Sequence, residues 1–208
     1  RLVMTFLNDA EKAQLRDAIR LAEAKTSGEI VTVIARASGD YFYYPTLWAA
    51  LLAILSPLLP IALAVSFAPL GIIELQMLVF ALLALAFRWP PIKRRLVPRA
   101  VQQQYCARRA REQFLAQNLH TTRERTGVLL YVSVAEHHVE LLADAGIHAK
   151  VPAGTWDQVV NKLTARVKAG QVGAGFIEAV NAIGSQLSAH FPAADVNPNE
   201  LPDHLIEL

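Results

Sequence analysis

The chain has 208 residues, of which 53% are hydrophobic, and a formal net charge of +2. This length holds one domain of ordinary size with room for an additional element. The small net charge and the lack of a basic stripe with interleaved aromatic residues argue against a nucleic-acid partner. The mean hydropathy of +0.29 is high for a soluble domain. Because the apolar residues concentrate between positions 46 and 87, we expect a membrane component.

The first segment predicts a helix followed by a strand. Asn8 and Glu11 have the spacing of a capping box, in which each side chain accepts a hydrogen bond from the other residue's backbone. The apolar face of the helix follows at helical spacing: Leu15, Ala18, Ile19 and Ala22. EIVTVIARA, residues 29–37, is mostly apolar at both alternating positions, which is typical of a strand covered on both faces. The opening RLVMTFLNDAEKAQL has too short an apolar run for a signal peptide, so we expect no cleaved export signal.

Residues 46–68 and 69–87 predict two membrane-spanning helices. The first run carries no charge and the second carries only Glu74. About 20 apolar residues cross a bilayer as a helix, and the prolines of the first run are tolerated there as kinks. We expect a minimal turn at Pro69 and Gly71 to join the two spans.

Aromatic and basic residues flank the two runs. The aromatic belts are Tyr41, Phe42, Tyr43, Tyr44, Trp48 and Trp89, and the basic residues are Arg88, Lys93, Arg94, Arg95 and Arg99. The loop between the runs has no Lys or Arg, so the positive-inside rule places both flanks and both termini in the cytoplasm. The basic cluster can also touch anionic headgroups, although setting the topology is its simpler role. The alternative is a buried helical hairpin in a soluble protein, where these flanks would have no purpose.

The rest of the chain predicts a helix, a β-hairpin and two more helices. These lie at about 100–119, 127–134, 138–144, 155–169 and 176–191. A second capping box at Thr155 and Gln158 opens the fourth element, and Gly170 ends it in a left-handed conformation. The tail, 193–208, is acidic and is expected to be extended and solvated.

These elements predict an α/β fold. A strand, a crossover helix and a second strand form a βαβ unit, and the membrane hairpin is an insertion into that crossover. The result is a three-layer sandwich, a small mixed sheet with helices on both faces. The expected domains are a discontinuous α/β domain over 1–40 and 98–192, a transmembrane hairpin with its basic flank over 41–97, and the tail.

Four stretches in order resemble the TPM domain family. They are LNDAEKAQLRDAIRLAEAKTSGEIVTVI, RTGVLLYVSVAEHHVELLADAGI, GTWDQVV with the last helix GAGFIEAVNAIGSQLSAHFP, and NPNELPD, which is similar to the closing motif of a bacterial membrane-anchored branch. The resemblance covers nearly all of the chain outside 37–97. It implies a three-layer α/β module at the bacterial inner membrane. Members are described as calcium-binding, as weak acid phosphatases, or as assembly and repair accessories of membrane complexes, and bacterial members often accompany LemA-like membrane proteins.

The resemblance also implies candidate metal ligands. Glu29, just before the first strand, and Asp144, after the third, match acidic features of the family. Where members carry a further acid, this chain has His148, and calcium prefers six to eight oxygen ligands. Glu29, Asp144 and His148 would form a mixed site for calcium or another divalent cation if the strand ends come together. The alternative is that Asp144 accepts backbone amides in a turn.

Other conspicuous residues indicate packing or turns. Cys106 is the only cysteine, and its helical context predicts a packed thiol. His137 and His138 would point to opposite faces of a strand, so they predict a solvated hairpin turn instead of a metal site. Ser133 lies in a strand without a glycine elbow, and no phosphate-loop lysine follows the glycines before the last helix.

We therefore expect a membrane-anchored accessory module without catalysis. Its expected partners are the lipid bilayer and a membrane protein, with a LemA-like protein as the candidate that the resemblance implies. Two alternatives stay open. One is a metal-dependent acid phosphatase that uses Glu29 and Asp144, and the other is a calcium-binding regulatory module.

Overall fold

The computed structural model describes residues 6–66, 68–152, 154–193, 201 and 203–208. The chain forms two compact units. Residues Arg1–Ser38 and Gln103–Leu208 make the first, here named the α/β unit, and Gly39–Gln102 make the second, named the hairpin unit. Each is described by itself.

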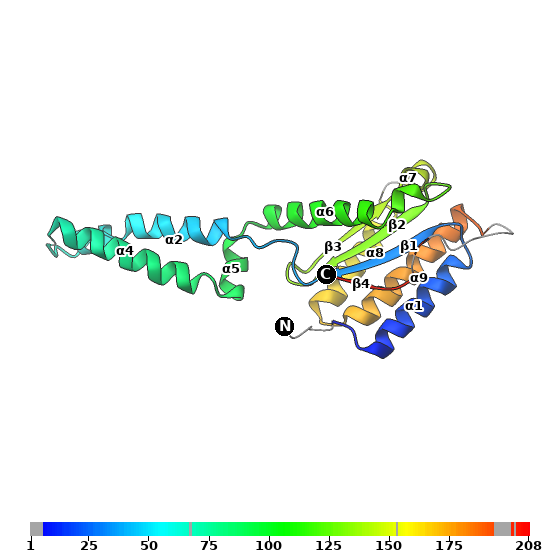
Figure 1. Cartoon of the computed structure of the whole chain (residues 1–208), viewed down its shortest axis with the longest axis horizontal. Helices are drawn as coiled ribbons and strands as arrows, with labels where there is room; N and C mark the ends of the chain where they lie inside the picture. Colours follow the sequence, from blue (N-terminus) through cyan, green and yellow to red (C-terminus); the bar gives the residue numbers. More distant parts are fainter. Residues whose placement is uncertain (1–5, 67, 153, 194–200, 202) are drawn as a thin grey trace. The chain divides into compact units, whose positions relative to one another are not determined.

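A four-stranded mixed sheet lies at the centre of the α/β unit (Figure 1). In the order β3-β2-β1-β4, its strands are β3 (His138–Ala143), β2 (Gly127–Ser133), β1 (Glu29–Ala35) and β4 (Ile206–Glu207). β1 and β2 are parallel and β2 and β3 are antiparallel, so the predicted crossover and hairpin are confirmed. β4 pairs in parallel with the other edge of β1, Val33 opposite Ile206. β4 was not predicted, because the tail was expected to be extended and solvated, whereas Ile206 and Glu207 pair with β1.

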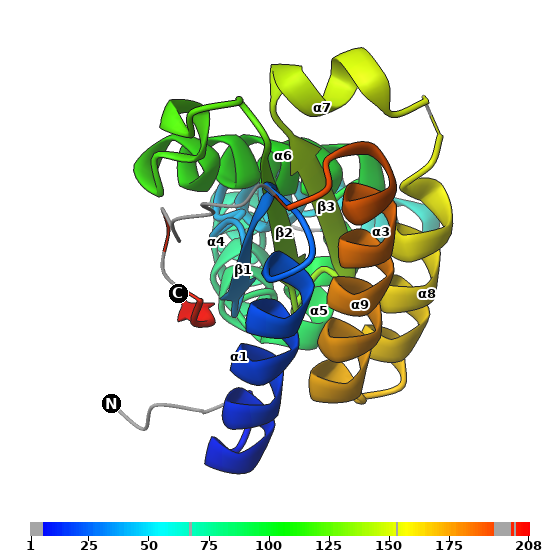
Figure 2. The ribbon, with the colours of Figure 1, turned by 90° about the vertical axis from the view of Figure 1, so that its right-hand side faces the viewer.

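Helices cover both faces of the sheet (Figure 2). One face carries α1 (Asp9–Glu23), α8 (Asp157–Lys168) and α9 (Val172–His190), and the other carries α6 (Arg99–Ala116), followed by a short 3-10 helix, Leu119–Thr121. Alternate strand residues enter two separate cores, Ile30 and Leu130 on the α1 side and Val31 and Tyr131 on the α6 side. The doubly apolar strands of the sequence are explained by this arrangement.

One of the two predicted capping boxes is present in the structure. The box at Asn8 is present, with both of its hydrogen bonds at 2.8 Å. The second box is wrong, because α8 begins only at Asp157 and the Thr155 hydroxyl donates to the Pro152 carbonyl at 2.7 Å. Gly170 has φ +75° after the end of α8, the left-handed conformation that was expected of it.

Over its described residues, the hairpin unit contains α2 (Tyr43–Leu55), α3 (Leu58–Ala62), α4 (Pro69–Ala86), α5 (Pro90–Leu96) and the start of α6. The first predicted span is not one regular helix, because a turn at Ser56 and Pro57 separates α2 from α3. Proline has no backbone N–H to continue the helical hydrogen bonds. The predicted turn at Pro69 and Gly71 is also wrong. Pro69 is the first residue of α4, a position that suits proline, and the chain reverses before it.

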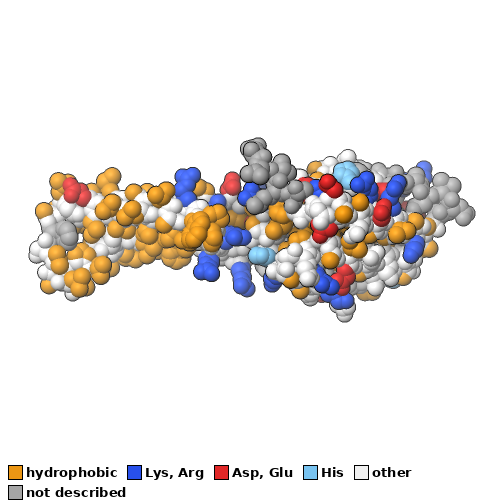
Figure 3. All heavy atoms as spheres, turned by 90° about the horizontal axis from the view of Figure 1, so that it is seen from below, with side chains coloured by type: hydrophobic (Ala, Val, Ile, Leu, Met, Phe, Trp, Pro, Cys, Tyr) orange, Lys and Arg blue, Asp and Glu red, His pale blue; other side chains and the backbone are white. Residues whose placement is uncertain are grey.

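The apolar side chains of the hairpin unit are exposed (Figure 3). Only 17% of the candidate span Tyr43–Ala62 is buried, and none of Pro69–Ala86. Both helices are long and apolar enough to cross a membrane. A core helix of a soluble protein would be mostly buried, so the alternative of a buried soluble hairpin does not describe this unit. α2 and α4 lie side by side, and the Gln76 amide donates to the Ile54 carbonyl at 3.3 Å.

Candidate functional site

Glu29 and Asp144 lie at the same end of the central strands. Glu29 is the first residue of β1 and pairs with Gly127, the first residue of β2. Asp144 follows β3 directly, and its backbone N–H donates to the Gly127 carbonyl at 2.9 Å. Two parallel strands begin here and an antiparallel strand ends here. The strand ends therefore meet, with Gly127 between the two acids.

The carboxylate of Asp144 is held by neighbouring donors. Asp144 is 6% exposed and caps α7 (Ala145–Lys150), accepting the Ala145 N–H at 2.7 Å. Arg125 donates to both carboxylate oxygens, at 2.7 and 3.1 Å, and this contact raises the pKa of the guanidinium. The geometry thus favours the alternative in which Asp144 stabilises a turn, with an ion pair added.

His148 does not complete a ligand set with the two acids. It is exposed on α7, and its backbone N–H donates to the Asp144 carbonyl at 3.2 Å. Among the residues that the structure describes, no group of three or more His, Cys, Asp or Glu side chains is placed to hold a metal ion. Calcium requires many oxygen ligands, so this edge as it stands does not fit calcium. The metal assignment of Glu29, Asp144 and His148 stays a prediction.

Three buried or half-buried carboxyl groups gather near the start of β1. Glu23, at the end of α1, is 8% exposed and accepts the Ile30 N–H at 2.8 Å. Burial raises the pKa of Glu23 to about 8, and the carboxylates of Glu29 and Asp203 and a hydrogen bond to Asp203 act in the same direction. Asp203 also forms an ion pair with Arg20, with 3.3 Å between its Oδ2 and the arginine Nε. Glu23 therefore carries a proton at neutral pH and can share it with Asp203.

Glu23 was not among the candidate site residues predicted from the sequence. Its signal was the spacing of α1, because Glu23 lies four residues after Ile19, which is in the core. Asp203 could not be assigned to the same place, since it approaches only when β4 pairs with β1. The cluster thus joins a helix end, a strand start and the tail.

A second polar cluster lies at the opposite end of β1 and β2. The Ser38 N–H donates to both carboxylate oxygens of Glu136, at 3.2 and 3.3 Å. The Ser38 hydroxyl bonds to the Tyr131 hydroxyl at 2.9 Å and donates to the Ser133 hydroxyl at 2.8 Å. Ser133 in turn donates to Glu136. This cluster was also missed, and its only sequence signal was the three-residue spacing of Ser133 and Glu136.

Cys106 completes the second cluster from α6. It is fully buried, with hydrogen bonds to Ser38 and Ser133, and burial raises the pKa of its thiol to about 11. A thiol that stays protonated is neither a nucleophile nor a metal ligand, so the prediction of a packed thiol is confirmed. Ser133 is equally buried and cannot meet a substrate. The cluster ties Ser38, the last residue before the hairpin unit, and α6 to β2.

The two adjacent histidines lie at the β2–β3 turn. His137 is exposed with φ +48°, a turn conformation. His138 is the first residue of β3, and its Nε2 lies 2.8 Å from a carboxylate oxygen of Glu140. The interpretation as a hairpin turn is confirmed for His137, and His138 pairs with a carboxylate on its own strand.

The fold defines a class of protein, an α/β domain with an exposed apolar helical hairpin inserted between its first two strands. Within it, residues 95–186 match the model of the TPM domain. The NMR structure of BA42 protein from the psychrophilic bacterium Bizionia argentinensis is similar to the chain. The TM-score is 0.62 at 20% identity, covering 99% of this chain and 97% of that chain, and at this identity the likeness shows the fold alone. No curated protein matches the sequence.

Proposed function

We propose that this chain is a membrane-anchored TPM-domain module that acts by binding a membrane protein complex and supporting its assembly or maintenance. The observation that carries the proposal is the exposure of the two apolar helices, Tyr43–Ala62 and Pro69–Ala86. Water would not favour so much continuous apolar surface, whereas a bilayer would cover it. The basic flank argues for a cytoplasmic α/β unit at a bacterial inner membrane.

The chemistry of the α/β unit supports binding over catalysis. Ser133 and Cys106, the side chains that resemble nucleophiles most, are fully buried and hydrogen-bonded within the unit. Asp144 is occupied by Arg125 and by a helix cap. These side chains stabilise the domain and are not available for catalysis. We therefore propose that the chain acts by binding, and that its partner is a membrane protein. A LemA-like protein is the first candidate, on the strength of the family resemblance.

Affinity purification of the tagged full chain in a mild detergent tests this proposal. We expect one membrane protein to co-purify in a constant ratio. A control with Leu78→Arg and Leu82→Arg in α4, which prevents insertion, should lose that protein. Repeated recovery of the chain alone from wild-type membranes would overturn the proposal.

Two alternatives that the family resemblance implies, a metal-dependent phosphatase and a calcium-binding module, rest on a single observation. The strand ends that carry Glu29 and Asp144 meet at Gly127. The test is phosphatase activity of the full chain with calcium or magnesium, together with calorimetry at millimolar calcium. Activity lost in both Glu29→Ala and Asp144→Ala would support the candidate. Activity that survives both changes removes these acids from the mechanism, and no heat with calcium ends the calcium-binding alternative.

A further inference from the structure

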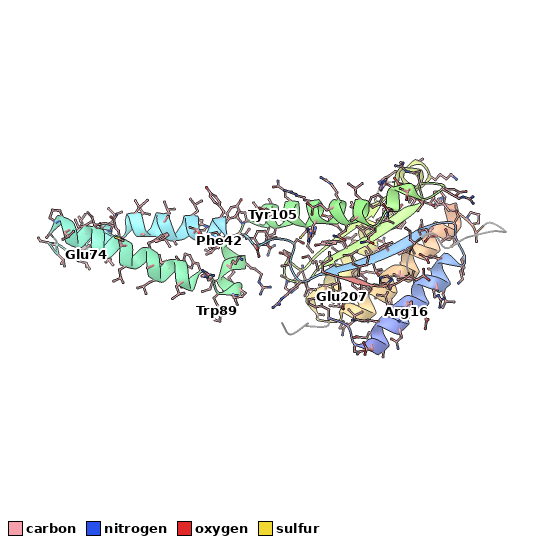
Figure 4. All side chains as sticks on the ribbon, in the orientation of Figure 1. Arg16, Phe42, Glu74, Trp89, Tyr105 and Glu207 are labelled. Carbon is pink, nitrogen blue, oxygen red and sulfur yellow. The ribbon has the colours of Figure 1, made fainter. Side chains whose placement is uncertain are left out.

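Glu74 is the only charged residue in the long apolar helix α4, which runs from Pro69 to Ala86. Figure 4 shows it at one end of the hairpin unit, with Trp89 and Phe42 at the other end. A helix rises about 1.5 Å per residue, so Glu74 lies about 20 Å from Trp89 along α4. The hydrocarbon core of a bilayer is about 30 Å thick, and tryptophan favours its boundary. With Trp89 at one boundary, the backbone of Glu74 lies about 10 Å inside the other, deeper than a glutamate side chain reaches.

Glu74 lies on the face of α4 that is turned away from α2. The partly buried side chains of α4 recur at spacings of three and four residues, which is one face of a helix: Ile72, Leu75, Gln76, Val79 and Leu83. On this face the Gln76 amide donates to the Ile54 carbonyl of α2 at 3.3 Å. The opposite face is exposed and consists of Leu70, Glu74, Met77, Leu78, Ala81 and Leu85. The hairpin therefore leaves this second face, here named the outer face of α4, to its surroundings.

The carboxylate of Glu74 has no partner within the hairpin unit. Two other polar side chains of the candidate spans are satisfied there, since the Ser56 hydroxyl donates to the Ala53 carbonyl at 2.8 Å and Gln76 bonds to Ile54. Among the residues that the structure describes, the side chain of Glu74 forms neither an ion pair nor a hydrogen bond. An ionisable side chain at this depth is costly in hydrocarbon unless another protein group pairs with it.

We propose that the outer face of α4 binds a transmembrane helix of another protein, and that this helix carries a lysine or arginine at the level of Glu74. Charge complementarity selects this partner, because a cation at that depth satisfies Glu74 and is satisfied by it, whereas lipid tails satisfy neither. A second copy of the chain does not supply the cation, since residues 46–87 contain no Lys or Arg. The exposed side chains of Met77, Leu78 and Leu85 would pack against the same helix.

This inference rests on the proposed function and deepens it. The proposed function is that the chain binds a membrane protein complex. The outer face of α4 is the surface through which that protein would be recognised, and an intramembrane cation is the chemistry that would identify it.

Association of the full chain with a defined helix tests the recognition. The chain carries a fluorescence donor on a terminal tag and is reconstituted in phosphatidylcholine vesicles. The probe is an acceptor-labelled transmembrane peptide of leucine and alanine that has one lysine about 10 Å inside its end, to match the depth of Glu74. The same peptide with leucine in place of that lysine is the reference, and energy transfer measures association.

Three variants of the full chain separate charge from insertion. Glu74→Leu removes the carboxyl group and makes α4 more apolar, so a loss of binding cannot come from failed insertion. Gln76→Leu is the matched control, because it also replaces a polar side chain by leucine at nearly the same depth, but on the face towards α2. Glu74→Lys reverses the charge and is combined with a peptide that carries glutamate at the same position.

We expect wild type and Gln76→Leu to bind the lysine peptide about five- to tenfold more tightly than the leucine peptide, and Glu74→Leu to bind both equally. Glu74→Lys should prefer the glutamate peptide. Equal binding of both peptides by wild type would overturn the inference and assign the carboxylate to lipid headgroups. An equal loss of preference in Gln76→Leu would also overturn it. Self-association of wild type that Glu74→Leu abolishes, without a preference for lysine, would assign the outer face to a second copy.

The same experiment separates this inference from the proposed function. If the wild-type chain does not enter vesicles and stays soluble without detergent, the membrane anchor itself is wrong, and both proposals fail. If it enters them and shows no preference for the lysine peptide, only the recognition through Glu74 is wrong.

Discussion

Glu23 holds a proton at neutral pH because it is buried beside two other carboxyl groups. Its pKa is raised from 4.5 to about 8 in the folded chain. The folded state therefore binds this proton more tightly than the unfolded state does. Its stabilising effect is complete below pH 4.5 and is lost as the pH rises towards 8.

We predict that the free energy of unfolding of the full chain, in a mild detergent, falls between pH 5 and pH 8. Glu23→Gln should flatten this dependence, since the amide keeps the bond from Ile30 and can still donate to Asp203 without titrating. Asp17→Asn, an exposed change on the same helix, is the control. Chemical unfolding followed by tryptophan fluorescence at each pH measures the effect. An unchanged pH dependence in Glu23→Gln would contradict this account of the cluster.

Asp144 provides the second prediction at the scale of the residue. If it acts chiefly as the cap of α7, Asp144→Ala should lower the free energy of unfolding by about 1–2 kcal/mol. Asp144→Asn should cost much less, because asparagine caps equally well and the ion pair with the half-exposed Arg125 adds little. Denaturant unfolding of both variants is the measurement. Equal losses in the two variants would show that the charge, and not the cap, is what matters.

Residue contacts could be predicted from sequence where both partners are close along the chain. The cap at Asn8 and the left-handed Gly170 are of this kind. The bonds from Ser38 to Tyr131 and from Glu23 to Asp203 are not, because each joins segments that only the folded sheet brings together. Both polar clusters were missed for this reason.

At the scale of elements, α1 and α9 pack closely at a glycine. A Cβ added at Gly184 would lie 2.6 Å from the Cβ of Ala22. We predict that the steric clash in Gly184→Ala lowers the free energy of unfolding by about 1–3 kcal/mol. The higher helix propensity of alanine offsets about 1 kcal/mol of this loss. Ser185→Ala, on the exposed side of the same helix, should stay within about 0.5 kcal/mol of wild type. Thermal unfolding measures both, and a stabilised Gly184→Ala would contradict the close contact.

The hairpin helices provide a second prediction at this scale. Arginine at the centre of a spanning helix costs about 2.5–3.5 kcal/mol of insertion free energy. Leu78→Arg, in the middle of α4, should therefore strongly reduce the fraction of chain that resists carbonate extraction. Leu70→Arg, in the first turn of α4, should reduce it far less, since the side chain can reach the interface. Equal effects at the two positions would argue that α4 does not span.

Long elements were predicted and short ones were not. β1 and β2 are apolar runs of 7 residues each, and α9 shows helical spacing over 19 residues. α5 and α7 have 7 and 6 residues, about two helical turns, and β4 has 2 residues, so none of the three shows a recognisable period. β4 moreover depends on the free edge of β1, which no local pattern reveals.

For the whole molecule, we propose that a membrane hairpin interrupts the α/β unit between β1 and β2, and that the part after the hairpin resembles a TPM domain. The insertion is compatible with the fold because the second polar cluster fixes both Ser38 and α6 to β2. The domain can thus close its sheet whatever the inserted segment does. The central claim is that this segment crosses a membrane twice, so that both of its ends emerge on one side.

Cysteine labelling tests that claim most directly. Cys106 is fully buried and should react little, so Asp40→Cys, Ser66→Cys and Arg99→Cys can each report on one position. Ser66 lies between the two spans, and Asp40 and Arg99 flank them. With a membrane-impermeant maleimide, we predict that Ser66→Cys is labelled only from outside intact cells, and the other two only in inverted membrane vesicles. Labelling of all three positions from the same side would contradict the membrane hairpin.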